Sequence, residues 1–233
     1  MTHPLRRVRW PLCAALTLVV AAGAVLSAQR RHPVTGRVIA PVMGVAGAAW
    51  LERPEREAEE APGRAIKALR LRPGQVVADI GAGSGYYALR LAKAVGPSGK
   101  VFATDIQPGM LDILRRQAQR AGVDNVVPVL SAVDDPKLAA GSLDLAIMVD
   151  VYHELAEPQI FVRRLREALK PDGRLVLIEF RREDPAIPIY EVHKMSVADV
   201  RAELEPEGYR LSEVLDDLPW QHIIVLERAP GSR

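Results

Sequence analysis

From Gln75 onwards, short apolar runs alternate with stretches in which apolar residues recur every three or four positions. The runs predict buried strands at 75–80, 100–105, 126–130, 143–149 and 174–180. The amphipathic stretches predict helices at 86–94, 108–121, 158–170 and 196–205. Because the strands lack a polar face, this alternation predicts an α/β fold whose parallel sheet is covered by helices on both faces.

The C-terminal part follows a different pattern. The helix that begins at Ser196, with Asp199 in capping-box position, is followed by two strand-like segments, 209–215 and 222–227. Two strands joined by a short turn predict an antiparallel hairpin at the sheet edge. The expected architecture is a doubly wound, seven-stranded sheet, mostly parallel with a C-terminal antiparallel hairpin.

The first 54 residues have a separate organisation. Arginines at positions 6, 7 and 9 precede an apolar run that ends near Ala28, so 1–28 is predicted to be a signal peptide or membrane anchor. The rest of the chain is then expected to be exported (periplasmic or secreted) or membrane-anchored; a start site further along would make it cytoplasmic. Residues 29–54 are interrupted by proline and glycine, and 55–228 form the main domain.

Composition narrows the candidate functions. Aromatic residues make up only 5% of the chain, so aliphatic side chains fill the core. The net charge of +2 depends on the three early arginines, and no basic stripe predicts a nucleic-acid partner. Cys13, the single cysteine, lies in the apolar run, which excludes disulfides, cysteine metal ligands and a cysteine nucleophile from the main domain. No metal site is predicted.

A glycine-rich loop follows the first predicted strand, in the sequence Asp79-Ile80-Gly81-Ala82-Gly83-Ser84-Gly85-Tyr86. Glycines there let a ligand approach the main chain without a Cβ in the way. The dinucleotide pattern G-x-G-x-x-G would need glycine at Tyr86, which disfavours a nicotinamide dehydrogenase. Asp79 suits a ligand with an ammonium group and repels a phosphate.

A second carboxylate, Asp105, ends the next predicted strand and can accept hydrogen bonds from both hydroxyls of a ribose. The alternative is local: Asp79 caps the following helix and Asp105 begins a turn. Their combination with three alternating glycines favours a ligand that joins a nucleoside to an amino acid.

These motifs resemble those of class I S-adenosylmethionine-dependent methyltransferases, over about residues 55–228. The resemblance implies a Rossmann-like fold and S-adenosylmethionine as cofactor. It places the cofactor on Asp79, Gly81, Gly83, Gly85 and Asp105, with Ile106 against the adenine. After the third strand this chain has Ser131-Ala132-Val133 where the family often has an acid, so either Asp134 or backbone would contact the adenine amino group.

The fourth predicted strand leads into Asp150-Val151-Tyr152-His153-Glu154, which looks like a variant of the family's hydrophobic-His-His motif. Ligands bind beyond the carboxyl ends of parallel strands, so Asp150 is expected at the cofactor and His153 at the acceptor as general base. Tyr152 would orient the acceptor, and Glu154 would fix the His153 tautomer. The alternative is that His153 only caps the next helix.

Two further segments are candidates for the substrate pocket. One segment contains Tyr190, His193 and Lys194, which could bind an anionic or phenolic substrate. Their presence is explained almost as well by a solvated loop with ordinary surface residues. Trp220 and His222 are weaker candidates. Trp50 lies in the segment 43–56, which we expect to fold over the cofactor cleft as a lid.

The sequence therefore predicts a methyltransferase for a small-molecule acceptor, with oxygen, carbon and nitrogen all open as the acceptor atom. The alternatives are another chemistry on the same fold, or a non-catalytic domain that binds S-adenosylmethionine or a partner. The predicted export conflicts with a cofactor made in the cytosol. Membrane association is expected only through 1–28, and the sequence predicts no oligomeric state.

Overall fold

The computed structural model describes residues 29–231, so the expected signal peptide or anchor and Cys13 lie outside the described residues. Between residues 29 and 231, no helix combines the length and the apolar character needed to cross a bilayer.

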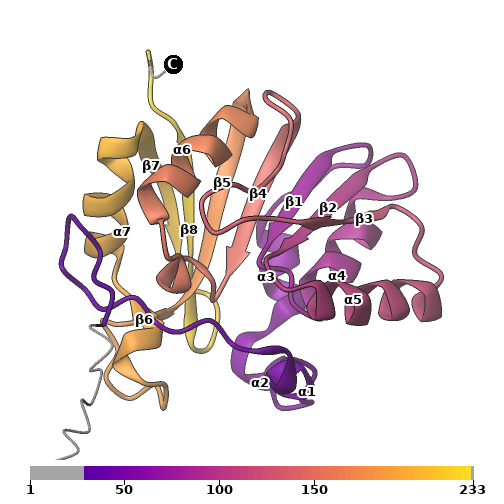
Figure 1. The fold of residues 1–233 in the computed structure, drawn as a ribbon, viewed down its shortest axis with the longest axis horizontal. Coiled ribbons are helices and arrows are strands. Elements are labelled where there is room, and N and C mark those ends of the chain that lie inside the picture. Colours follow the sequence, from indigo (N-terminus) through magenta and orange to yellow (C-terminus); the bar gives the residue numbers. More distant parts are fainter. Residues whose placement is uncertain (1–28, 232–233) are drawn as a thin grey trace, which may run out of the picture.

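One sheet forms the centre of the molecule (Figure 1). Its strands are β1 (Val76–Ile80), β2 (Lys100–Asp105), β3 (Val126–Leu130), β4 (Leu143–Val149), β5 (Leu169–Arg181), β6 (Lys194–Met195), β7 (Tyr209–Leu215) and β8 (Gln221–Arg228). The order is β3-β2-β1-β4-β5-β8-β7, and β6 pairs with the end of β5. Strands β1 to β6 pair in parallel, whereas β8 is antiparallel to both β5 and β7.

The chain leaves the sheet centre through β1, β2 and β3 and returns to the other side of β1 through β4. The strand order therefore reverses between β1 and β4, which pair at Ile80 and Met148. A crevice opens at the carboxyl ends of strands where the order reverses, because the connections leave toward opposite faces.

Helices cover both faces of the sheet (Figure 1). They are α1 (Ala48–Leu51), α2 (Arg56–Glu60), α3 (Pro62–Ala68), α4 (Tyr86–Val95), α5 (Pro108–Ala121), α6 (Pro158–Ala168) and α7 (Val197–Leu204). The 3-10 turns are η1 (Val45–Gly47), η2 (Tyr152–Glu154), η3 (Glu191–His193) and η4 (Glu205–Glu207).

Two apolar clusters fill the spaces between sheet and helices. Val77 packs with Leu91 and Leu114 of α4 and α5, whereas its neighbour Ala78 packs on the other face with Leu165 of α6. Successive strand residues point to opposite faces, so a strand buried on both sides must be apolar throughout.

The predicted elements are largely confirmed. The bounds of β2, β3, β4, α5 and β7 match the prediction, and Ser196 Oγ accepts from Asp199 N at 3.0 Å at the start of α7. The helix predicted to reach residue 170 ends at Ala168, because the chain at Leu169 already pairs with Leu143 of β4.

The sheet has one strand more than the seven predicted. Strand β6 has only two residues and so carries no readable periodicity. The predicted hairpin is present, and β8 lies inside the sheet while β7 forms its edge.

Residues 37–51, which we call the N-terminal strap, run from α7 past the carboxyl ends of the central strands to α1 (Figure 1). Arg37 Nε donates to Glu203 Oε1 of α7 at 2.8 Å, and both side chains are buried. Ala40 N donates to His153 O at 3.0 Å, which ties the strap to the segment after β4.

Candidate active site

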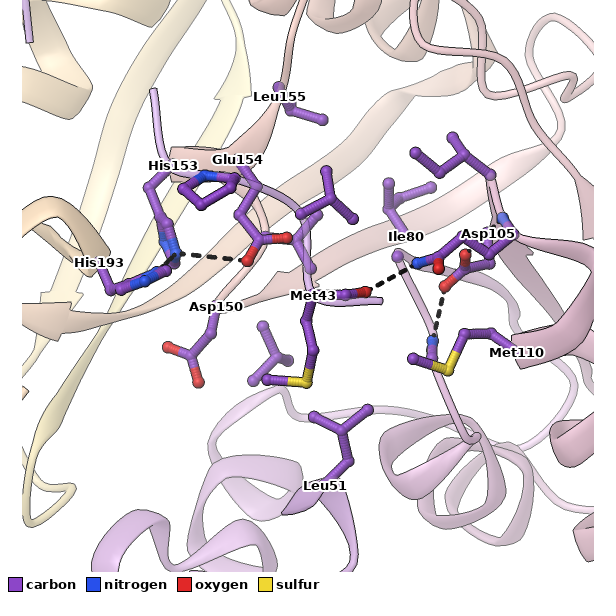
Figure 2. Close-up of a pocket in the computed structure, with 18 of the residues that line it drawn as sticks. Met43, Leu51, Ile80, Asp105, Met110, Asp150, His153, Glu154, Leu155 and His193 are labelled. Atoms are coloured by element: carbon purple, nitrogen blue, oxygen red, sulfur yellow. Dashed lines mark hydrogen bonds and ion pairs between the residues drawn. The ribbon is translucent and has the colours of Figure 1, made fainter. Parts of the chain in front are cut away.

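A pocket of about 920 Å³ lies at the carboxyl ends of β1, β2 and β4, beneath the strap. Figure 2 shows Asp150, His153, Glu154 and His193 on one side, Ile80, Asp105 and Met110 on the other, and Met43 of the strap between them. Apolar side chains from the strap, from Phe161 and Phe180, and from the segment 188–190 form most of the remaining wall.

The glycine loop forms part of the pocket wall because its backbone adopts left-handed conformations. Gly81, Gly83 and Gly85 have φ values of 66°, 53° and 96°. Gly81 and Gly83 line the pocket, and a Cβ on Gly81 would come within 2.7 Å of Val151 Cγ2. Gly85 instead faces α5, where a Cβ would meet Leu114 at 3.0 Å, so this glycine serves packing.

Asp105 faces the pocket from the end of β2. Its Oδ2 accepts from Gly83 N at 3.0 Å, and its Oδ1 accepts from Gln107 N at 2.8 Å. The local turn considered for Asp105 is therefore present, and the same carboxylate also holds the glycine loop. Ile106, 38% exposed, lines the pocket beside it.

Asp79 lies one layer deeper, beneath the loop, and is not among the pocket-lining residues. Its carboxylate accepts from Ala88 N, so it does cap α4, but its Oδ2 has no partner within the described chain. Burial raises the pKa of Asp79 to about 7, and the nearby Arg56 opposes this shift.

Asp150 has a similar environment after β4. It is a non-glycine residue with φ of 54°, and it lines the pocket. Its Oδ2 accepts from Gln221 Nε2 at 2.7 Å, whereas its buried Oδ1 has no partner in the described part of the chain. Burial, with Glu60 nearby, raises the pKa of Asp150 well above its ordinary value.

His153 is held by a carboxylate on the neighbouring strand. Its Nδ1 lies 2.6 Å from Glu179 Oε2, and its Nε2 lies 3.0 Å from His193 Nδ1. A carboxylate can only accept, so the His153 tautomer that suits Glu179 donates Nδ1–H to it and leaves the lone pair on Nε2. Glu154 Oε1 lies 4.0 Å from Nε2, so the expectation that Glu154 fixes the tautomer is wrong; Glu179 does so.

Comparison with known proteins agrees with this geometry. A family described as "Methyltransferase domain" matches residues 77–173. The ubiquinone/menaquinone biosynthesis C-methyltransferase UbiE of Pasteurella multocida is 28% identical over 161 residues, which are 66% of this chain and 60% of that protein. UbiE of Cupriavidus metallidurans is 30% identical over 133 residues, 57% of this chain and 54% of the relative. A solved SAM-dependent methyltransferase from Aquifex aeolicus has a TM-score of 0.75 at 27% identity, covering 79% of this chain and 98% of that one.

Residues 77–173 therefore match a methyltransferase domain, and the chain is similar in sequence and fold to S-adenosylmethionine-dependent methyltransferases. It spans 60% and 54% of the two curated relatives. S-adenosylmethionine is the cofactor of this family.

The pocket of the methyltransferase domain fits that cofactor. Asp150 faces the pocket with a buried carboxylate oxygen that has no partner in the described chain, which suits a cationic group of the cofactor, whereas Asp79 lies one layer beneath the loop. Arg56 lines the pocket and suits a carboxylate, although it also donates to Glu60 at 2.7 Å. The turns at Gly81 and Gly83 leave backbone open to the pocket.

Other predicted residues of the methyltransferase domain lie elsewhere. Tyr152 is fully buried in the core, and Asp134 pairs on the surface with Arg164 at 2.9 Å, while residues 131–133 line the pocket. Lys194 is buried and donates to Glu191 at 2.9 Å, outside the pocket lining.

Of three further candidates for the substrate pocket, two line the pocket and one does not. Tyr190, 83% exposed, and His193 do line the pocket. His222 is buried in β8 and does not line it.

The segment expected to act as a lid packs over the glycine loop. Met43, Trp50 and Leu51 line the pocket. Glu52 contacts Ser84 of the loop, and Glu57 accepts from Tyr86 Oη at 2.8 Å. The segment therefore covers the cleft in this structure.

Sequence reasoning missed two residues of the methyltransferase site, Glu179 and Arg56. A signal existed for Glu179, because an acid in the apolar run 175–180 demands a buried partner. Arg56 had no such signal, since it lies among other charged residues in a short helix.

Proposed function

We propose that this protein transfers the methyl group of S-adenosylmethionine to a small-molecule acceptor. The observation that carries the proposal is the continuity of the pocket, which holds the glycine loop and Asp105 at one end and His153 at the other. A cofactor bound at the first end would present its methyl group toward the second.

The cofactor end of the site provides binding and orientation. Bound S-adenosylmethionine supplies an electrophilic methyl carbon. Asp105 would hold the ribose hydroxyls, and Ile106 would pack on the adenine. Asp150 and Arg56 would face the charged amino-acid part, while Asp79 lies beneath the loop that carries it. Fixing the reacting groups in line converts a bimolecular step into an effectively unimolecular one.

The acceptor end provides a proton acceptor and an apolar wall. In the tautomer that donates Nδ1–H to Glu179, the lone pair of His153 Nε2 can take a proton from an acceptor hydroxyl or acidic carbon. The apolar wall, which includes Met43, Phe161 and Phe180, suits an acceptor with an apolar body. Two relatives are named for C-methylation in quinone biosynthesis, and we propose an aromatic or enolic acceptor with an ionisable hydroxyl here.

A panel of hydroquinones and phenols incubated with the protein and S-adenosylmethionine tests this proposal through S-adenosylhomocysteine release. We expect His153→Ala to lower turnover about 100-fold, the typical contribution of a positioned base. Cofactor affinity, measured by isothermal titration, should stay unchanged in this variant.

Asp105→Asn is the matched variant at the other end of the pocket. In contrast to His153→Ala, it should lower cofactor affinity. Full turnover in His153→Ala would contradict the assigned base. Cofactor binding without turnover across the panel would favour the alternative of a non-catalytic cofactor-binding domain.

We also propose that residues 1–28 direct the protein out of the cytosol or anchor it in the membrane. The support is the sequence alone, three arginines followed by an apolar run. Fractionation of cells with sequencing of the mature N-terminus tests this. A soluble cytosolic protein with an intact N-terminus would contradict it, and would remove the conflict with a cytosolic cofactor.

A further inference from the structure

The acceptor end of the pocket gathers three side chains that are all metal ligands by type. Within residues 29–231, His153, Glu154 and His193 form a group whose ligand atoms all lie within 4.8 Å of one another. All three side chains line the pocket (Figure 2); Glu154 and His193 are half-buried, and His153 is buried.

The distances within this group are close to those of a coordination sphere. Donor atoms around a four-coordinate zinc at ~2.0–2.1 Å lie roughly 3.3 Å apart. His153 Nε2 and His193 Nδ1 are 3.0 Å apart, and Glu154 Oε1 is 4.0 Å from His153 Nε2. A side-chain rotation that moves Glu154 Oε1 by on the order of 1 Å would complete a set of three ligands on one side of the ion.

Glu179 supplies a second, independent feature of a metal site. It accepts the Nδ1 proton of His153 and so directs the Nε2 lone pair toward His193 and Glu154. Metal-binding histidines nearly always donate their other ring N–H to a carboxylate or carbonyl, which fixes the ring and raises its basicity.

The charges around the cluster also favour a cation. The ion pairs of Glu154 and Glu179 within the described chain are both with His153. Arg37 and Arg56 on either side are bonded to Glu203 and Glu60.

We propose that His153 Nε2, His193 Nδ1 and the Glu154 carboxylate bind one divalent ion of the zinc class, with an open position toward the acceptor. Two nitrogens and one carboxylate favour Zn²⁺ or Co²⁺ over Mg²⁺, which prefers oxygen ligands. The sequence prediction of no metal site is contradicted by this proposal; it excluded cysteine ligands, and this cluster contains none.

A bound ion would change how the acceptor is activated. It would occupy the lone pair of His153 Nε2, so that His153 holds the ion, and the ion lowers the pKa of a coordinated acceptor hydroxyl. This role rests on the proposed function, whereas the metal site itself does not. This role predicts an acceptor whose hydroxyl binds the ion. The same hydroxyl would either attack the methyl group or direct methylation to a neighbouring carbon.

Metal binding can be measured without cofactor or acceptor, on untagged full-length protein freed of metal by dialysis against chelator. Equilibrium dialysis with Zn²⁺ should give one ion per chain, and Co²⁺ should give the visible absorption of a low-symmetry site with nitrogen ligands. His193→Gln and Glu154→Gln should each weaken binding at least tenfold.

Two further variants test whether the ion is coordinated by these side chains or only attracted by nearby negative charge. Glu179→Gln should keep the stoichiometry and weaken affinity roughly 10- to 100-fold, the effect of losing an outer-shell partner. Glu191→Gln, two residues from His193 with an exposed carboxylate, is the matched control and should leave binding unchanged.

Absence of saturable binding at one ion per chain would overturn the proposal. So would equal affinity in wild type, His193→Gln and Glu154→Gln, because the ion would then bind elsewhere. A chain that binds the ion through this cluster but transfers no methyl group would support the metal site and contradict the proposed function.

Discussion

At the residue scale, Asp79 and Asp150 are arranged for a ligand at a cost to folding. Each carries a buried carboxylate oxygen without a partner in the described chain, and Asp150 also has a left-handed backbone conformation. Buried polar groups without hydrogen bonds and strained backbone both cost free energy and concentrate at functional sites. A cationic ligand would remove part of this cost.

The first prediction at this scale concerns Asp79 and pH. Its pKa is about 7 in the folded protein and 3.8 for an unperturbed side chain, so the native state binds more protons in between. Stability is therefore highest below the lower value and falls as pH rises toward 7, by about 1.4 kcal/mol per pH unit from this group. Glu154, with a pKa of about 7, adds a similar contribution.

Urea unfolding at pH 5, 6 and 7 measures this slope. Asp79→Asn should flatten it by up to about 1.4 kcal/mol per pH unit, and the exposed Asp134→Asn should not change it. Parallel pH profiles for wild type and Asp79→Asn would contradict the buried, unpaired carboxyl.

The second prediction separates backbone strain from steric clash in the glycine loop. Gly81 and Gly141 have similar φ values of 66° and 61°, but only Gly81 faces a close neighbour, Val151. Gly141→Ala should cost about 1 kcal/mol of unfolding free energy from strain alone. Gly81→Ala should cost roughly 3 kcal/mol, because Val151 must move as well. Equal losses in chemical unfolding would remove Val151 from the explanation.

At the element scale, a buried ion pair is one of the contacts that hold the strap over the pocket. Arg37 reaches Glu203 of α7, whose carboxylate also contacts His32 at 3.2 Å. Removing one member of a buried pair leaves the other charged and unpaired. The strap therefore depends on a contact between residues 166 positions apart in the chain.

Glu203→Gln should lower the free energy of unfolding by about 3 kcal/mol, the usual loss for a broken buried pair. Its neighbour Glu205 forms an exposed pair with Arg201 at 2.8 Å, and Glu205→Gln should cost at most about 0.5 kcal/mol. Urea unfolding of both variants provides the comparison. A loss of equal size at Glu205 would show that the Arg37 contact is not what stabilises the strap.

At the scale of the whole molecule, the reversal of strand order between β1 and β4 creates the crevice that the loop, strap and α2 line. A ligand that binds only the folded state stabilises it by about 2.7 kcal/mol at one hundred times its Kd. S-adenosylmethionine at that level should raise Tm by on the order of 5 to 10 °C. NADH should give no shift, since Tyr86 stands where the dinucleotide pattern needs glycine. An equal shift with NADH would contradict the assigned cofactor.

The sequence determined the features that depend on neighbouring residues. Apolar periodicity placed the strands and helices, since a strand buried on both faces and an amphipathic helix differ in period. The spacing of Gly81, Gly83 and Gly85 after a strand, followed by Asp105, indicated the cofactor loop and the resemblance to methyltransferases.

Only the tertiary structure decided the contacts between distant segments. It placed Asp79 beneath the loop, gave His153 its partner Glu179, and brought His193 to within 3.0 Å of His153 across 40 residues of sequence. The local sequence pattern cannot show which distant residues come into contact, because these contacts depend on strand order and on the paths of β6, η3 and the strap. The acceptor end of the pocket is therefore a product of the fold, whereas the cofactor loop was readable in the chain itself.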